Sequence, residues 1–450
     1  MSGSFTRTDR NLSNVDRDHL RNCGMSMNET ERGLGWKIPP CEGPLVLNNT
    51  DRLQLRRKRM AQSPALLRGG FRPFFVGAAA WAVISLAVWI MILFDLAHSQ
   101  LFEDPLAWHR HEMLFGFVGA AIAGFALTAV PNWTGRLPIA GGPLAMLFGI
   151  WVAGRLLPFL VSPENLLLLI IEPGFYVLLA LLLAREIIKS RNRNFPIVAV
   201  IGLFGIADLV DRVAMAGLLE MTKIGWQSGL ALVVFLISVI GGRIVPSFTR
   251  NWLMAQHAGE PMPTQPDRFD KVVLVFTALA LMLWLFWPSS VPTGVGLIAT
   301  AIAHFVRLVR WQGWRCRSNA LLSILHVGYL WLPAGLFLLA LAQLTLVSET
   351  AAIHALTAGA MATMILAVMS RASLGHTGRE LAASKLTTIA FVLINIAAVM
   401  RVSAALGIEE QRITLILAAF AWFAAFGLFL LEYIPILFSE SNKKGSEERS

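Results

Sequence analysis

Histidines are the residues of this chain whose type and placement best suit chemistry. His109 and His111 open a long apolar run, His326 and His354 lie inside other apolar stretches, and His376 follows one. Neutral imidazole is the commonest nitrogen ligand for iron, copper and zinc. A polar ring in lipid is costly unless it is paired, so such residues usually have a function. These five histidines are the candidate ligands of a metal ion or a haem, with interhelical hydrogen bonding or helix capping as the alternative.

Spacing limits what the first pair can do together. Two residues apart on a helix means about 200° of rotation, so His109 and His111 cannot both face one ligand unless His109 precedes the helix. Glu112 follows directly. It is either an acid that stabilises a helix start or a hydrogen-bond partner of a ligating histidine.

Acidic side chains also fall inside an apolar run, in the segment ADLVDRV. Asp208 and Arg212 are four residues apart, which favours a neutralised pair on one helix face. The functional alternative is a proton path through Asp208 and Asp211.

Arginines are the third group with chemical potential, because the guanidinium fork matches a carboxylate such as a haem propionate. Arg243 is the cofactor-binding candidate, and Arg371 and Arg379 are further ones. For the last two, anchoring at the cytoplasmic membrane surface is the stronger interpretation.

Hydropathy shows which elements must position these groups. The 450 residues include only 15% charged ones, and the mean hydropathy is +0.61, which excludes an ordinary soluble domain. About 20 apolar residues in a helix span a hydrocarbon core of roughly 30 Å. We expect an all-α, polytopic membrane helix bundle of about twelve transmembrane helices, at roughly 74–96, 108–131, 143–161, 165–185, 196–219, 227–247, 271–288, 291–310, 320–344, 351–370, 386–405 and 412–434.

Charge predicts the orientation of these spans. Lys and Arg collect in alternate loops, which places both termini in the cytoplasm. The net charge of +10 therefore reflects topology and contact with anionic lipid, and no nucleic acid is expected as a partner. On this topology His109, His111 and His354 lie toward the external side, and His326 and His376 toward the cytoplasm.

An internal repeat is visible in the same segments. Aligning His111 with His354 also aligns Gly116 with Gly359, and it aligns residues 134–136 with residues 377–379, both Thr-Gly-Arg, without a gap. The segment GGRIVPSFTRNW, residues 241–252, has a related exit but no leading histidine. These stretches fall in spans 2, 6 and 10, which predicts possible internal four-helix repeats.

Three regions are expected along the chain. Residues 1–65 are polar and end in a basic run, which predicts a disordered cytoplasmic tail. Residues 66–436 form the transmembrane domain, and 437–450 form a charged cytoplasmic tail. Translation can start at Met1 or at Met60. The three cysteines all fall on the cytoplasmic side, so a disulfide framework is not expected.

Several motifs together resemble the NnrS family of bacterial membrane proteins: FRPFF (71–75), WHRHEMLFGF (108–117), AVPNWTGR (129–136), GRIVPSFTRNW (242–252), LHVGYLWL (325–332) and residues 354–379. The resemblance covers nearly all of residues 66–434. It implies a twelve-helix inner-membrane protein that binds haem b and copper. It also implies a role in nitric oxide metabolism during denitrification and in resistance to nitrosative stress.

Three functions compete on these grounds. The first is a haem–copper protein that meets nitric oxide or a related small gas inside the membrane. The second is a secondary transporter that uses Asp208 and Asp211. The third, a sensor, ranks last because no signalling segment is present. Whether the protein is an enzyme stays open, and its electron donor is unknown, because the chain carries no flavin or iron–sulfur motif.

Overall fold

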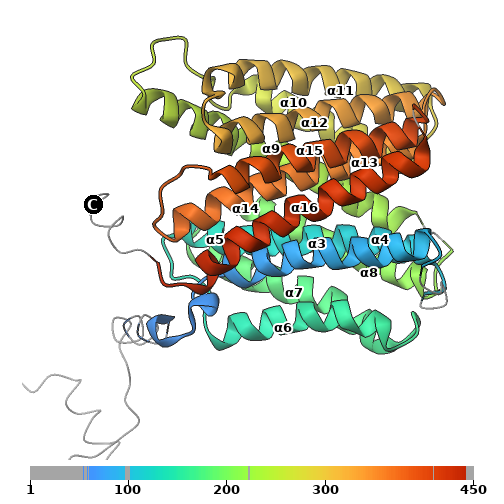
Figure 1. Ribbon diagram of the computed structural model, residues 1–450, viewed down its shortest axis with the longest axis horizontal. Helices are drawn as coiled ribbons and strands as arrows, with labels where there is room; N and C mark the ends of the chain where they lie inside the picture. The colour runs from blue at the N-terminus through green and yellow to red at the C-terminus, as the bar shows by residue number, and fades with distance from the viewer. Residues whose placement is uncertain are drawn as a thin grey trace, which may run out of the picture. The chain divides into compact units, whose positions relative to one another are not determined.

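The computed structural model describes residues 60–96, 102–220, 223–408 and 410–441, together with Gln54 and Lys58. Within these residues the chain is helical, with no β-strand, and the long helices run side by side along one direction (Figure 1). The predicted all-α bundle is thereby confirmed. Most of the predicted N-terminal tail and residues 442–450 of the predicted C-terminal tail lie outside the described residues.

Twelve long helical segments occupy the described part of the chain, one at each predicted span. Two of them consist of α-helix, π-helix and α-helix in continuous succession. The segments are α3 (Phe71–Leu93); α4 (Pro105–His111), η3 (Glu112–Val118) and α5 (Gly119–Thr134); α6 (Gly142–Leu156); α7 (Leu166–Lys189); α8 (Phe195–Met215); α9 (Ile224–Ala255); α10 (Arg268–Phe286); α11 (Val291–Arg310); α12 (Ala320–Gln343); α13 (Glu349–His354), η6 (Ala355–Met361) and α14 (Ala362–His376); α15 (Lys385–Leu406); and α16 (Gln411–Phe438). Short 3₁₀ turns are η1 (Ala65–Leu67), η4 (Leu157–Phe159) and η5 (Gly313–Cys316).

Eleven of these segments are long and apolar enough to cross a membrane. The twelfth, α8, has 21 residues but carries Asp208, Asp211 and Arg212, which lower its apolar character. All three of these side chains are buried against neighbouring helices. The helix is therefore a full member of the bundle whose polar face is turned inward.

Helix ends follow local sequence signals. Asp104 accepts a hydrogen bond from the backbone N–H of Ala107 and so caps α4. The Thr-Gly-Arg exits contain Gly135 and Gly378, both with φ near +70°, which only glycine adopts readily. These two glycines occupy the same position in the repeat.

Packing arranges the twelve segments as three successive four-helix units. The first runs from α3 to α7, the second from α8 to α11, and the third from α12 to α16. The last helix of each unit packs against the first helix of the next, as α7 on α8, α11 on α12, and α16 on α3. These three contacts close the units into a ring. Inside the ring, the second segments of the units contact one another; they are η3 with α5, α9, and η6 with α14.

The repeat extends to unusual local geometry. The π-helix η3 begins directly after His111, and η6 begins directly after His354. A π-helix has i→i+5 hydrogen bonds, is rare, and is frequently found at functional sites. The expected repeat therefore agrees with the structure at its two histidine-bearing segments.

Candidate metal centre

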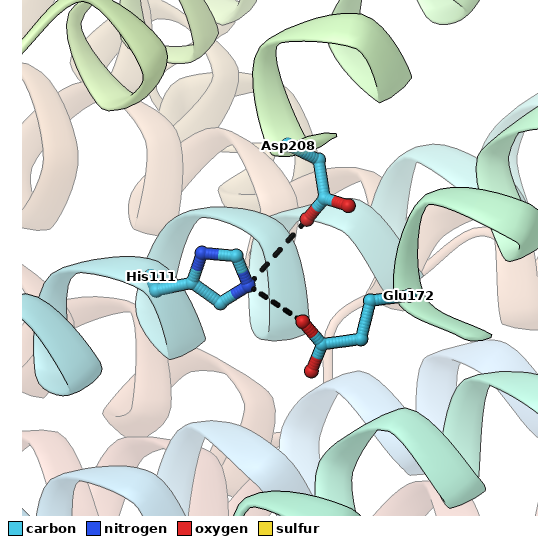
Figure 2. Close-up of side chains that lie close together, drawn as sticks. All are labelled: His111, Glu172 and Asp208. Carbon is cyan, nitrogen blue, oxygen red and sulfur yellow. Dashed lines mark hydrogen bonds and ion pairs between the residues drawn. The ribbon is translucent and has the colours of Figure 1, made fainter. Parts of the chain in front are cut away.

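His111 is the centre of a buried polar cluster between α4, α7 and α8. Its Nδ1 lies 2.8 Å from Asp211 Oδ2. Its Nε2 lies 3.1 Å from Glu172 Oε2 and 3.5 Å from Asp208 Oδ1. Figure 2 shows this nitrogen directed between the two carboxyl groups. One ring nitrogen and two carboxylate oxygens thus converge from three helices, all within 4.8 Å of one another.

Sequence spacing explains how α8 supplies two of these acids. Asp208 and Asp211 are three residues apart, so they project from the same helix face. The side chains of the cluster are essentially inaccessible to solvent, with His111 and Asp208 at 0% exposure. Burying several charges requires compensation from nearby groups of opposite sign.

Two arginines supply that compensation around Glu172. Arg212 Nε donates to Glu172 Oε2 at 2.6 Å, and Arg155 Nη2 lies 3.0 Å from Glu172 Oε1. Arg155 also pairs with Glu112, which accepts a second hydrogen bond from Trp81 Nε1. Glu112 is therefore linked to the histidine site through Arg155 and Glu172, in keeping with a supporting partner. The expected pairing of Arg212 with Asp208 is replaced by its pairing with Glu172.

Glycine makes room for this arrangement. A Cβ on Gly116 would lie 2.7 Å from Glu112 Oε2 and 2.8 Å from Arg155 Nη1. The equivalent glycine of the repeat, Gly359, would place a Cβ 2.5 Å from the ring of Trp331. The aligned glycines are thus places where a side chain or ring crosses close to the helix backbone.

The number of protons on the His111 ring and its carboxylate neighbours limits what the site can hold. Carboxylates only accept hydrogen bonds, so two ring nitrogens that both face carboxylates need two protons, unless a metal ion replaces one. Both oxygens of Asp208 are buried without a hydrogen-bond donor. A cation between Nε2, Glu172 and Asp208 would satisfy these atoms. Asp211 would then accept from Nδ1–H, the usual support of a metal-bound histidine.

The other two external histidines have different partners. His354 Nδ1 donates to the backbone carbonyl of Thr350 at 2.8 Å, which leaves the lone pair on Nε2. His109 stacks on Trp89 with ring centroids 4.6 Å apart. His354 interacts electrostatically with both His109 and Arg401. His109 and His354 therefore lie in one environment and His111 in another, as the spacing of His109 and His111 requires.

The structure gives the internal histidines separate neighbours. His326 Nε2 lies 2.9 Å from Thr249 Oγ1, and its Nδ1 is buried without a hydrogen-bond partner. The exposed ring of His376 packs on Phe71, 5.5 Å between centroids. Arg243 is exposed and donates to Asn194 Oδ1 at 2.8 Å. Cofactor or metal binding by His326, His376 and Arg243 stays a prediction.

His304 has the environment of a structural histidine. Thr277 donates its hydroxyl proton to Val273, so it accepts from His304 Nε2 at 2.9 Å. His304 Nδ1 in turn lies 2.8 Å from the hydroxyl of Tyr329, which also accepts from Arg307. One neutral tautomer satisfies every group in this network.

Glu172 is the important residue that the sequence analysis missed. It is a lone acid within the run LLLLIIEPGF. An ionisable residue inside an apolar helix is itself a functional signal, and it would have flagged this position. Its pairing with His111 could not be found, because the two residues are 61 positions apart in the chain.

Comparisons with known proteins add a family assignment. The chain matches the family model described as NnrS protein over residues 65–441. No curated protein matches the chain.

Proposed function

The chain belongs to the NnrS family, and on that premise we propose that it is a multi-pass metalloprotein of the bacterial inner membrane that acts in the response to nitric oxide. The centre of this proposal is a metal ion held by His111, Glu172 and Asp208. The observation that carries it is the buried carboxylate of Asp208. Its oxygens accept no hydrogen bond, although the Nε2 atom of His111 lies 3.5 Å from Oδ1. Such a group is costly unless a cation or a proton joins it.

The donor set bears on the identity of the metal. One imidazole with two carboxylates suits a divalent ion such as iron(II), manganese(II), zinc(II) or copper(II), whereas copper(I) prefers sulfur ligands. Copper, which the family resemblance implies, would therefore bind here in its oxidised state. Three protein ligands leave coordination positions for a small molecule such as nitric oxide.

Haem b is the second cofactor that we propose, with His354 as the residue that would hold its iron. Its Nδ1–H is fixed by the carbonyl of Thr350, which presents the Nε2 lone pair. Arg401 is the nearby cation, a suitable partner for a propionate. Haem would supply a redox centre and an iron to which the gas could bind. Electrons would come from a separate donor, since the chain carries no flavin or iron–sulfur motif.

Metal analysis and the optical spectrum of the purified full-length protein test this function. We expect His111→Ala to lose the metal ion and His354→Ala to lose the Soret absorption. His257→Ala, an exposed loop histidine, serves as the control and should lose neither. Full metal content in His111→Ala together with an unchanged Soret band in His354→Ala would reject both assignments.

Transport is the alternative, and the inward-facing Asp208 and Asp211 are the observation that favours it. In that case the two carboxyl groups carry protons rather than support a metal. Metal-free, colourless protein that drives substrate or proton flux in proteoliposomes would establish the alternative and exclude the metal centre.

A further inference from the structure

An apolar cavity of about 100 Å³ lies where the second segments of the three units meet. Val118 and Ala121 line it from η3 and α5, Leu236 from α9, and Met364 and Val368 from α14. The lining consists of hydrocarbon and thioether groups. The cavity is partly open, since Phe125 and Ile365 in its wall are half-buried, and its walls offer almost no polar atom.

Such walls determine what can occupy the space. A buried water molecule makes about three hydrogen bonds, and it enters only where polar partners exist. Helical backbone groups are already paired with one another, and a methionine sulfur is only a weak acceptor. Water inside this cavity would lose its hydrogen bonds without replacement, so the walls favour an apolar occupant over water.

Size then selects the ligand class. An apolar cavity of about 150 Å³ in another protein stays empty of water and takes up benzene or xenon. At about 100 Å³, this cavity has room for a molecule of a few heavy atoms. We propose that it is a binding site for a small, uncharged, apolar gas molecule such as a diatomic gas.

The position of the cavity relates this site to the metal centre. Val118 is the last residue of η3, the π-helix that begins directly after His111. Seven residues of helix correspond to roughly 10 Å along the axis. Phe115 lies between them and packs on the His111 ring, with centroids 4.9 Å apart. A delivery role for the gas rests on the proposed function, whereas gas binding itself does not.

Flexible side chains suit a site that must fill and empty. Met361, Met364 and Met369 all line the cavity from the same wall. Methionine has three rotatable bonds and adapts to gaps in a packed core. Movement of these side chains would open paths for a small molecule without unpacking the helices.

Xenon provides a direct probe, because it is apolar, small and visible by anomalous scattering. We expect crystals of the full-length protein under xenon pressure to show a xenon atom between Val118 and Met364. Val118→Phe fills the cavity and should abolish the signal. Val275→Phe makes the same change at a lipid-facing position, 58% exposed, and should leave the signal intact.

A second variant, which enlarges the cavity instead of filling it, keeps the test valid if Val118→Phe fails to fold. Phe125 also lines the cavity, so Phe125→Ala enlarges it and should raise xenon occupancy. Absence of xenon from the wild-type cavity, full occupancy in Val118→Phe, or ordered water in unpressurised crystals would each overturn the proposal. Xenon in a protein that binds no metal would keep the gas site and remove the metal centre. Metal without xenon would do the reverse.

Discussion

Replacing Asp208 by asparagine separates the metal-bound from the metal-free interpretation of the buried cluster. The carboxylate is fully buried, its oxygens lack hydrogen-bond donors, and the nearest nitrogen that could pair with it is His111 Nε2 at 3.5 Å. In metal-free protein, Asp208→Asn removes one of several crowded carboxylates. The free energy of unfolding should stay constant or rise by about 1–3 kcal/mol, the usual cost of an unsatisfied buried group.

In metal-loaded protein the same change removes a ligand. Loss of even an indirect support of a bound metal weakens affinity by about 10- to 100-fold. We therefore expect at least about 100-fold weaker binding for Asp208→Asn, which corresponds to about 2.8 kcal/mol. Metal titration and unfolding in detergent, with and without chelator, measure both quantities. Asp95→Asn, at an exposed helix end, is the matched control. Unchanged metal affinity, or equal destabilisation with and without metal, would refute the reasoning.

Three further predictions test side-chain packing elsewhere in the bundle. Gly119→Ala would place a Cβ 1.9 Å from the Tyr176 hydroxyl, so it should destabilise the protein by about 1–3 kcal/mol in thermal unfolding. Gly174→Ala is the control, because its added Cβ meets open space and should leave the stability unchanged. Equal stability of the two variants would contradict the geometry. Tyr329→Phe removes a hydrogen-bond partner from both His304 and Arg307, so it should lower the free energy of unfolding by about 1–3 kcal/mol. The metal content should stay constant. A loss of metal would place this cluster in the functional site. Burial raises the pKa of the Cys316 thiol, in a loop outside the spans, to about 11, so the thiol stays protonated at neutral pH and should resist alkylation in folded protein until the pH approaches that value. Rapid alkylation at pH 7 would show that the loop exposes this residue.

The sequence was sufficient to predict the bundle because membrane helices are marked by length and hydropathy alone. Each predicted span contains one helical segment, including α8, whose charges weaken the signal. The gap-free match of His111 with His354 also carried structural information, since a π-helix follows both residues. What could be predicted was therefore local along the chain or repeated in it.

The metal site depends on contacts between distant segments, and that part could not be read from one sequence. The spacing of His109 and His111 predicted that the two rings would face different ligands, but it did not show which ring would contact the acidic side chains. Asp208 was expected to pair with Arg212 through local spacing. Glu172, 40 residues from Arg212, competes for that guanidinium and holds it. Charge pairing in a low-dielectric interior is decided by the full set of neighbours.

The coordination sphere of the bound metal tests the central claim most directly. X-ray absorption spectroscopy of the metal in the full-length protein reports the type and number of its ligands. Our account predicts one imidazole nitrogen and at least two oxygens, with the nitrogen contribution lost in His111→Ala. A sphere of sulfur ligands, or one of imidazole alone that persists in His111→Ala, would contradict it.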